Sequence, residues 1–174
     1  MSRFFGTIGA IWGVGGILAL LIYSCWRLSG VSIEAFAFQL DWRHWSLLIL
    51  NTAFMAYSEG YRGFQLAFSP RVVARAKFIA ERPTWLRVAL APLFCMSYFE
   101  APRNRLVVSY VLTVGIVLFI VGFQYLSQPW RGLLDVGVVV GLTWGVVTII
   151  SNLITALTTA HFDVSPEVPL AKTG

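Results

Sequence analysis

Two opposite charges inside a long apolar stretch are the residues of this chain with the clearest chemical potential. Glu59 and Arg62 lie three positions apart in the largely apolar segment 45–68. Residues at this spacing share a face of an α-helix, so the carboxylate and the guanidinium can form an ion pair. An ionisable side chain in a membrane segment is costly and usually faces protein or water, which makes the pair a candidate site. A purely structural pair near the helix end, with Arg62 reaching the interface, is the alternative.

The segment 45–68 is long enough for a helix that crosses a bilayer, which needs about 20 residues. Small residues recur along it at steps of three and four and predict a smooth face for close helix packing: Ala53, Ala56, Gly60, Gly63 and Ala67. Aromatic residues predict a second face: Phe54, Tyr57, Tyr61, Phe64 and Phe68. Glu59 and Arg62 fall on the remaining arc. We therefore expect this charged arc to contact something other than the helices packed on the small residues.

The composition of the whole chain is that of a membrane protein. Of its 174 residues, 57% are hydrophobic and 12% are charged, and its mean hydropathy is +0.74. A soluble domain has about 45–50% apolar and about 25% charged residues. The net charge of +5 is concentrated between residues 71 and 105, which indicates anionic lipid headgroups at the cytoplasmic face. No basic sheet or recognition-helix pattern suggests nucleic acid as a partner.

We predict an all-α integral membrane protein whose single domain, residues 1–160, contains four transmembrane helices. The four spans are expected over residues 4–26, 45–68, 106–126 and 132–159. Glycines give the first span a small-residue face, and the fourth span has the most specific packing signal, a zipper of Gly137, Gly141 and Gly145. The third span is uniformly apolar and is expected to face lipid most. Residues 161–174 lose periodicity and are expected to form a mobile tail.

Between the second and third spans, residues 69–105 are predicted to form an interfacial amphipathic arm in two parts. Ser69 and Pro70 are a helix start signal, and the basic helix expected after them has the pattern of helices that lie in the interface. The second part, residues 85–99, is interrupted by Pro92 and is shorter than the roughly 20 residues of a span. We expect it to be interfacial or re-entrant, with a fifth span as the alternative.

The distribution of basic residues predicts the orientation. Seven arginine and lysine residues lie between residues 69 and 105, and the two loops on the other side carry three arginines. Because basic residues accumulate on the cytoplasmic side, four spans place both termini in the cytoplasm. We expect the protein in a bacterial cytoplasmic (inner) membrane.

The sequence contains no motif for catalysis, metal binding or nucleotide binding. HExxH, GxSxG, Walker and GxGxxG patterns are all absent. The predicted topology places Cys25 and Cys95 about 30 Å apart on opposite faces, too far for a disulfide. It separates His44 from His161 in the same way, so one chain cannot form a two-histidine metal or haem site. We therefore expect no catalytic residue, no metal and no cofactor.

The sequence favours a non-catalytic accessory or assembly subunit of a larger membrane complex. Three small-residue faces and a basic arm exceed what a four-helix monomer needs, so the expected partners are membrane lipids, including anionic headgroups, and another membrane protein or a second copy. The residues expected to contact them are Glu59, Tyr61, Arg62, Arg71, Arg75 and Arg87. Helix packing is assigned to Gly60, Gly63, Gly137, Gly141 and Gly145.

Two other functions stay open at this stage. One is a small transporter or proton-linked carrier that uses Glu59 with Asn51 or Asn152. The other is an enzyme that acts on lipid at the interface, with Tyr61, Glu59 and Arg87 near the level of the headgroups. Replacement of Glu59 by Gln distinguishes these functions from assembly, because it would abolish transport or catalysis and only loosen a complex.

Overall fold

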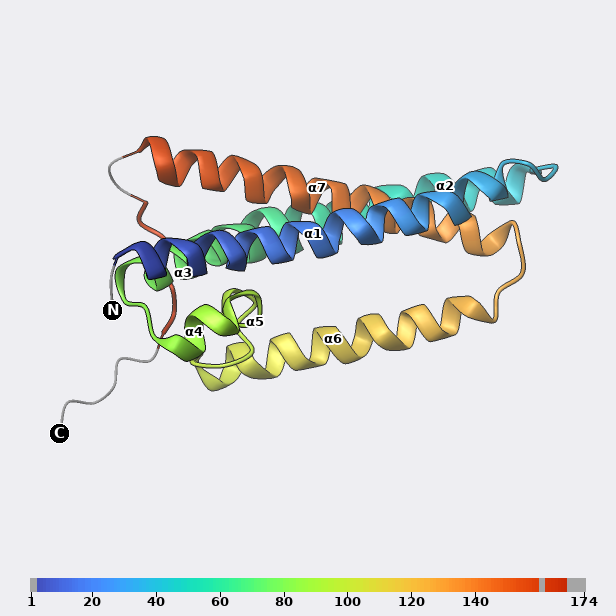
Figure 1. Cartoon of the computed structure of the whole chain (residues 1–174). Coiled ribbons are helices and arrows are strands. Elements are labelled where there is room, and N and C mark those ends of the chain that lie inside the picture. Colours follow the sequence, from blue (N-terminus) through green and yellow to red (C-terminus); the bar gives the residue numbers. More distant parts are fainter. Residues whose placement is uncertain (1–2, 160–161, 169–174) are drawn as a thin grey trace.

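The computed structural model describes residues 3–159 and 162–168, and within these ranges all regular secondary structure is helical. Four long helical segments lie along one axis and alternate in direction (Figure 1). In chain order they are α1 (Arg3–Ala35), the joined helices α2 (Trp42–Met55), η1 (Ala56–Phe68) and α3 (Ser69–Glu81), then α6 (Arg103–Gln124) and α7 (Trp130–Thr158). The short helices α4 (Trp85–Ala89) and α5 (Ala91–Cys95) precede α6. α1 begins and α7 ends at the same end of the molecule (Figure 1).

Three helices, α1, α6 and α7, are long and apolar enough to cross a membrane. They have 33, 22 and 29 residues, whereas a span needs about 20. The prediction of an all-helical protein with membrane-spanning helices is confirmed to this extent. A fourth span over residues 45–68 stays a prediction. α2, η1 and α3 have only 14, 13 and 13 residues each, although they follow one another directly.

The expected helix start at Ser69 and Pro70 is not a break in the chain's helical path. Ser69 has helical backbone angles, φ −62° and ψ −45°, and its N–H donates to the carbonyl of Phe64. η1 therefore passes directly into α3, which packs against α1. A methyl group added at Gly6 of α1 would lie 2.5 Å from the carbonyl oxygen of Ala80. The apolar residues Val72, Ala76 and Ile79 of α3 are buried in the core of the bundle.

Residues 85–99 form two five-residue helices followed by turns. Since a helix rises 1.5 Å per residue, each of them covers only about 7.5 Å, and the alternative of a fifth span is wrong. Both short helices contact the glycine face of α1, and Val88 Cγ2 of α4 would lie 2.9 Å from a methyl group at Gly9. Methyl groups at Gly13 and Gly16 would lie 2.9 Å from Cys95 Sγ and 2.7 Å from Pro92 Cγ. The glycines of α1 thus allow this segment to pack closely within the same chain.

The main core joins α1, α3, α5 and α7. Its central side chains, Ile17, Ile79, Phe94 and Ile149, come from these four helices in that order, and each is at most 1% exposed. Beyond this core, α7 also packs along the joined helices α2 and η1. The core therefore fixes how α7 lies against η1, where the candidate site is found.

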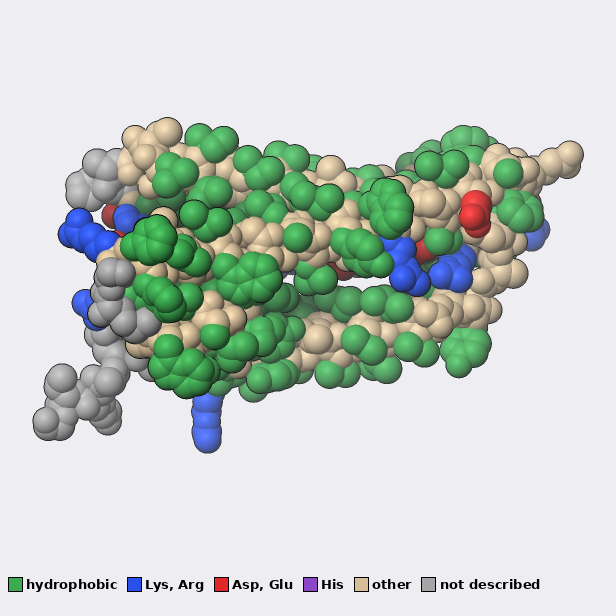
Figure 2. All heavy atoms as spheres, viewed as in Figure 1, with side chains coloured by type: hydrophobic (Ala, Val, Ile, Leu, Met, Phe, Trp, Pro, Cys, Tyr) green, Lys and Arg blue, Asp and Glu red, His purple; other side chains and the backbone are tan. Residues whose placement is uncertain are grey.

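α6 stands apart from the other long helices. None of its residues is buried, and the space-filling view shows an opening between α6 and the rest of the molecule (Figure 2). Its first turns are held by hydrogen bonds from Ser109 Oγ to the Met96 carbonyl, 3.0 Å, and from the Tyr110 hydroxyl to the Tyr98 carbonyl, 3.3 Å. α6 and α7 are antiparallel, as their short connection predicts, but they diverge from that connection (Figure 1).

Candidate functional site between η1 and α7

η1 is a π-helix of 13 residues, in which each backbone hydrogen bond spans one residue more than in an α-helix. Each turn therefore contains more than the 3.6 residues of an α-helix. The residues that face α7 accordingly recur at steps of four and then five: Asn51, Met55, Glu59, Phe64 and Ser69. π-helical turns are rare and are often found at functional sites. The candidate site is therefore sought on η1 and on the helix that packs against it.

The three glycines of the predicted zipper lie on the surface of α7 that meets α2 and η1. A methyl group at Gly137 would touch Asn51 and Met55, and one at Gly145 would lie 2.6 Å from Phe64 Cδ1. Gly60 of η1 lies under Trp144, at 3.0 Å by the same measure.

The sequence also assigns Gly63 to helix packing, but in the structure Gly63 does not face another helix. A methyl group on it would meet only the Ser58 carbonyl of its own helix. In the described structure, Gly60 and the three glycines of α7 therefore form the helix contact without it.

Glu59 points into this interface, directly opposite the middle glycine. A methyl group at Gly141 would lie 3.3 Å from both Cβ and Oε2 of Glu59. The Glu59 side chain is half-buried. Within residues 3–159 and 162–168 it takes part in none of the three close contacts between acidic and basic side chains, which join Asp41 to His44, Arg87 to Glu100 and Arg105 to Glu167.

The expected ion pair between Glu59 and Arg62 is not formed. Arg62 is exposed, whereas Glu59 faces α7. Three residues nearly complete a turn of an α-helix, but they fall well short of one in the wider turn of a π-helix. The two side chains therefore point in different directions. Of the two residues, only Arg62 faces outward. The expectation that Glu59 also faces away from the other helices of the bundle is wrong.

The other polar side chains of the interface have hydrogen-bond partners. Asn51 Nδ2 donates to the Leu134 carbonyl at 3.0 Å, and Trp144 Nε1 donates to Gln65 Oε1 at 2.9 Å. The hydroxyls of Ser69 and Thr148 lie 2.8 Å apart, and one donates to the other. Asn51 thus binds backbone of α7 rather than Glu59. Asn152, the other expected partner of Glu59, donates within its own helix to the Thr148 carbonyl.

The residues expected to act on lipid do not converge on one site. Tyr61 is 40% exposed and stacks on Tyr57, with ring centroids 6.1 Å apart. Arg87 of α4 is paired with Glu100, with Nη2 and Oε2 2.6 Å apart. Glu59 faces α7 instead. No contact in the described chain joins Tyr61, Glu59 and Arg87, so the arrangement offers no support for lipid chemistry there.

Arg75 differs most from its expected place. It is 0% exposed, and its guanidinium donates to the backbone carbonyls of Phe94, Phe99, Glu100 and Pro166. It also lies over the ring of Phe94, 3.9 Å from the centroid. Burial lowers the pKa of Arg75 to about 10, which leaves the side chain charged at neutral pH. The prediction that Arg75 contacts a partner or a headgroup is therefore wrong, because its donors are used within the chain.

The remaining predicted basic contact, Arg71, is half-buried and donates to the Ala67 carbonyl of its own helical segment at 3.1 Å. Residues 162–168, which belong to the expected mobile tail, have no regular secondary structure and lie against this end of the bundle. Pro166 accepts from Arg75, and both carboxylate oxygens of Glu167 accept from Arg105, at 2.7 and 3.0 Å. Residues 161 and 169–174 of the expected tail lie outside the described residues.

Asp135 is an acidic residue of α7 that lies one helical turn after Arg131, the spacing of an ion pair on a helix surface. The structure buries it to 4% exposure. Among the described residues, neither Asp135 Oδ2 nor the Nε atom of Arg131 has a hydrogen-bond partner, and the two side chains form no ion pair. The signal that could have found it is an acidic residue in a continuous apolar helix, since intramembrane charge is a functional hypothesis by default.

His44 has a structural role at the start of α2. The Asp41 carboxylate accepts from the N–H groups of Arg43 and His44, and the Asp41 N–H donates to His44 Nδ1. The His44 ring packs on Trp130, with centroids 4.2 Å apart. The backbone hydrogen bond from His44 lowers the pKa of Asp41. These contacts account for His44 without a ligand.

Within the described ranges, no group of three His, Cys, Asp or Glu residues is placed to hold a metal ion. No protein-family model matches the chain, and no curated protein or solved structure is significantly similar to it. The geometry of the η1–α7 interface is therefore the basis for a functional proposal.

Proposed function

We propose that this is a small proton-linked membrane protein in which Glu59 binds the proton. The observation that carries this proposal is the position of the Glu59 carboxyl, which lies against Gly141 between two helices with no cation beside it in the described chain. An unpaired carboxylate is costly to remove from water. A closed interface therefore favours the neutral acid, and an interface opened to water favours the carboxylate.

The π-helical form of η1 provides a way to open and close the interface. Conversion of one π-turn to an α-turn changes the number of residues per turn and rotates the side chains before it relative to those after it. Glu59 lies within the first turn of η1, so such a change would move it relative to Gly141. Gly60 and Gly63 lower the steric resistance to the change because they have no Cβ atom. Protonation of Glu59 and the form of η1 would thus be coupled.

Proton uptake into liposomes tests this proposal. The purified protein is reconstituted around a pH-sensitive dye, and an inward proton gradient is applied with valinomycin and potassium present to remove the opposing voltage. We expect uptake faster than in empty liposomes, reduced to the empty-liposome rate by Glu59→Gln. Glu34→Gln removes an exposed carboxylate and serves as the matched control, which should retain the wild-type rate. Equal uptake by wild type and Glu59→Gln would contradict the proposal, as would no uptake by wild type.

A second candidate function, an accessory or assembly subunit of a larger membrane complex, is supported by α6. This helix has no buried residue and is apolar on all sides, so it can offer a face to another membrane protein or to a second copy. Photo-crosslinkers at Val114 and Leu118, which are 58% and 66% exposed, would test it in native membranes. Adducts with one defined protein are expected, whereas crosslinks to lipid alone would contradict this role.

A further inference from the structure

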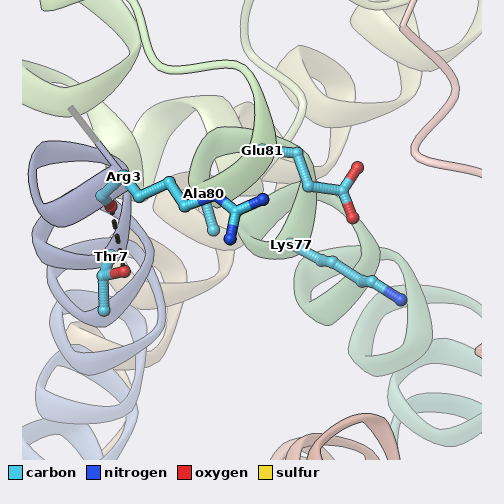
Figure 3. Close-up of a pocket in the computed structure, with 5 residues that line it drawn as sticks. All are labelled: Arg3, Thr7, Lys77, Ala80 and Glu81. Atoms are coloured by element: carbon cyan, nitrogen blue, oxygen red, sulfur yellow. Dashed lines mark hydrogen bonds between the residues drawn. The ribbon is translucent and has the colours of Figure 1, made fainter. Parts of the chain in front are cut away.

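A hollow lined by charged residues lies where the first turns of α1 meet the last turns of α3. Its volume is about 420 Å³, and its lining residues are Arg3, Thr7, Lys77, Ala80 and Glu81 (Figure 3). This volume falls within the roughly 300–1,000 Å³ of small-molecule sites. None of these residues belongs to the η1–α7 interface, so the hollow is separate from the proposed proton site.

Close helix packing brings the charged residues of the hollow together. Gly6 lets the backbone of α1 approach Ala80, which places Arg3 and Thr7 beside Lys77 and Glu81. Thr7 is occupied in its own helix, because its hydroxyl donates to the Arg3 carbonyl at 3.1 Å (Figure 3). Lys77 and Glu81 lie one turn apart on α3 and are both exposed. The fold thus presents two cations and one carboxylate around one hollow.

These three charges are available to a ligand. Among the residues that the structure describes, Arg3, Lys77 and Glu81 belong to none of the three close contacts between acidic and basic side chains. A guanidinium and an ammonium group both bind phosphate oxygens, the first with a planar fork of donors and the second as a point charge. A carboxylate accepts hydrogen bonds from a primary ammonium group. The lining therefore matches a ligand that carries a phosphate and an amine.

The surroundings of the hollow match the level of lipid headgroups. Arg3 is the first residue of α1, a helix apolar enough to cross a membrane. Directly after it, Phe4 and Ile8 are 74% and 44% exposed and offer an apolar surface to acyl chains. A charged hollow beside the polar end of a spanning helix is where a phospholipid headgroup lies. Soluble ligands would gain nothing from the exposed apolar side chains.

We propose that this hollow binds a phospholipid headgroup of the phosphoethanolamine class. Arg3 and Lys77 hold its phosphate, and Glu81 accepts hydrogen bonds from its primary ammonium group. A quaternary ammonium has no N–H to donate, and a glycerol headgroup has no positive charge. The site therefore prefers phosphatidylethanolamine to phosphatidylcholine and phosphatidylglycerol. This assignment does not depend on the proton-linked role of Glu59.

Lipid competition measured by native mass spectrometry tests the assignment. The full-length protein in mild detergent is mixed with equal amounts of the three phospholipids, and the retained lipids are counted. We expect wild type to retain mainly phosphatidylethanolamine. Lys77→Gln should weaken retention of phosphatidylethanolamine and of phosphatidylglycerol by roughly tenfold, the effect of losing one charge-assisted hydrogen bond. Glu81→Gln should lower only phosphatidylethanolamine and raise phosphatidylglycerol, so that the preference reverses.

Arg103→Gln provides the matched control, because Arg103 is an exposed arginine outside the hollow. It should retain lipids as wild type does. Equal retention of the three lipids by wild type would overturn the assignment, as would the same loss in Arg103→Gln as in Lys77→Gln. Wild-type selectivity in Glu81→Gln would overturn the role of the carboxylate. Competition by glycerophosphoethanolamine at lipid concentrations would show a soluble ligand instead and would also overturn the lipid assignment.

Discussion

Gly145 gives the most direct test of the helix contact on which the candidate site depends. A methyl group added there would lie 2.6, 2.7 and 2.8 Å from three carbons of the Phe64 ring. Ordinary van der Waals contact begins near 3.5 Å, so the ring or the helix must move by roughly 1 Å. Overpacking of this kind costs about 1–3 kcal/mol. The higher helix propensity of Ala offsets up to about 1 kcal/mol of that cost.

The matched control is Gly115→Ala on α6, where no atom lies within 4 Å of an added methyl group. Both variants gain helix propensity, and only Gly145→Ala meets another helix. With about 2–4 °C per kcal/mol for a chain of this size, we expect Gly145→Ala to unfold roughly 2–12 °C below Gly115→Ala. Thermal unfolding in a mild detergent, followed by circular dichroism, measures the difference. Equal melting temperatures would refute the close packing of η1 on α7.

Three further predictions concern other parts of the structure. Arg75→Ala leaves buried carbonyls without donors, at about 1–3 kcal/mol each, so this variant should fail to fold or should unfold at a much lower denaturant concentration than wild type. Arg62→Ala changes an exposed residue and should alter stability by only about 0.5 kcal/mol. Similar chemical denaturation of the two variants would contradict the buried role of Arg75. A C-terminal reporter that functions only in the cytoplasm should be active, and one that functions only outside should be silent, because the basic residues predict a cytoplasmic C-terminus. The opposite result would contradict the predicted orientation. Because the pKa of Asp41 is lowered in the folded protein, its carboxylate stabilises the start of α2 above the ordinary carboxyl pKa, and this stabilisation is lost as the pH falls through the folded pKa. Amide exchange at the start of α2 should therefore increase on acidification in wild type and not in Asp41→Asn. Equal responses of the two proteins would contradict the capping role of Asp41.

The sequence was informative wherever ordinary helical periodicity applies. Glycines at steps of three and four identified the packing faces of α1 and α7, because only a missing side chain allows backbones to approach so closely. The break within residues 85–99 was also within reach, since Pro92 and the short apolar run argued against a regular span, although a fifth span stayed open until the two short helices were seen.

Periodicity failed in residues 56–68, because every face drawn there assumed 3.6 residues per turn. The π-helix moved Glu59 into the interface and left Gly63 without a partner helix. Over only three turns, the sequence pattern does not distinguish the period of an α-helix from that of a π-helix.

The burial of Arg75 depended on residues far away in the chain. Its acceptors are separated from it by 19 to 91 positions, and a basic amphipathic helix has the same local sequence whether its charges face water or backbone carbonyls. Asp135 was missed for a related reason. Its position one turn after Arg131 is that of a surface ion pair, and only tertiary packing buries it.

The acceptor set of Arg75 also constrains the order in which the protein can be completed during synthesis. Phe94, Phe99 and Glu100 leave the ribosome soon after Arg75, but Pro166 follows it by 91 residues, after α6 and α7. At roughly 5–20 residues per second, that interval is about 5 to 18 s. During it the guanidinium lacks its last acceptor and the bundle end is not closed by the 162–168 segment. Closure of this end therefore reports that α7 has been synthesised.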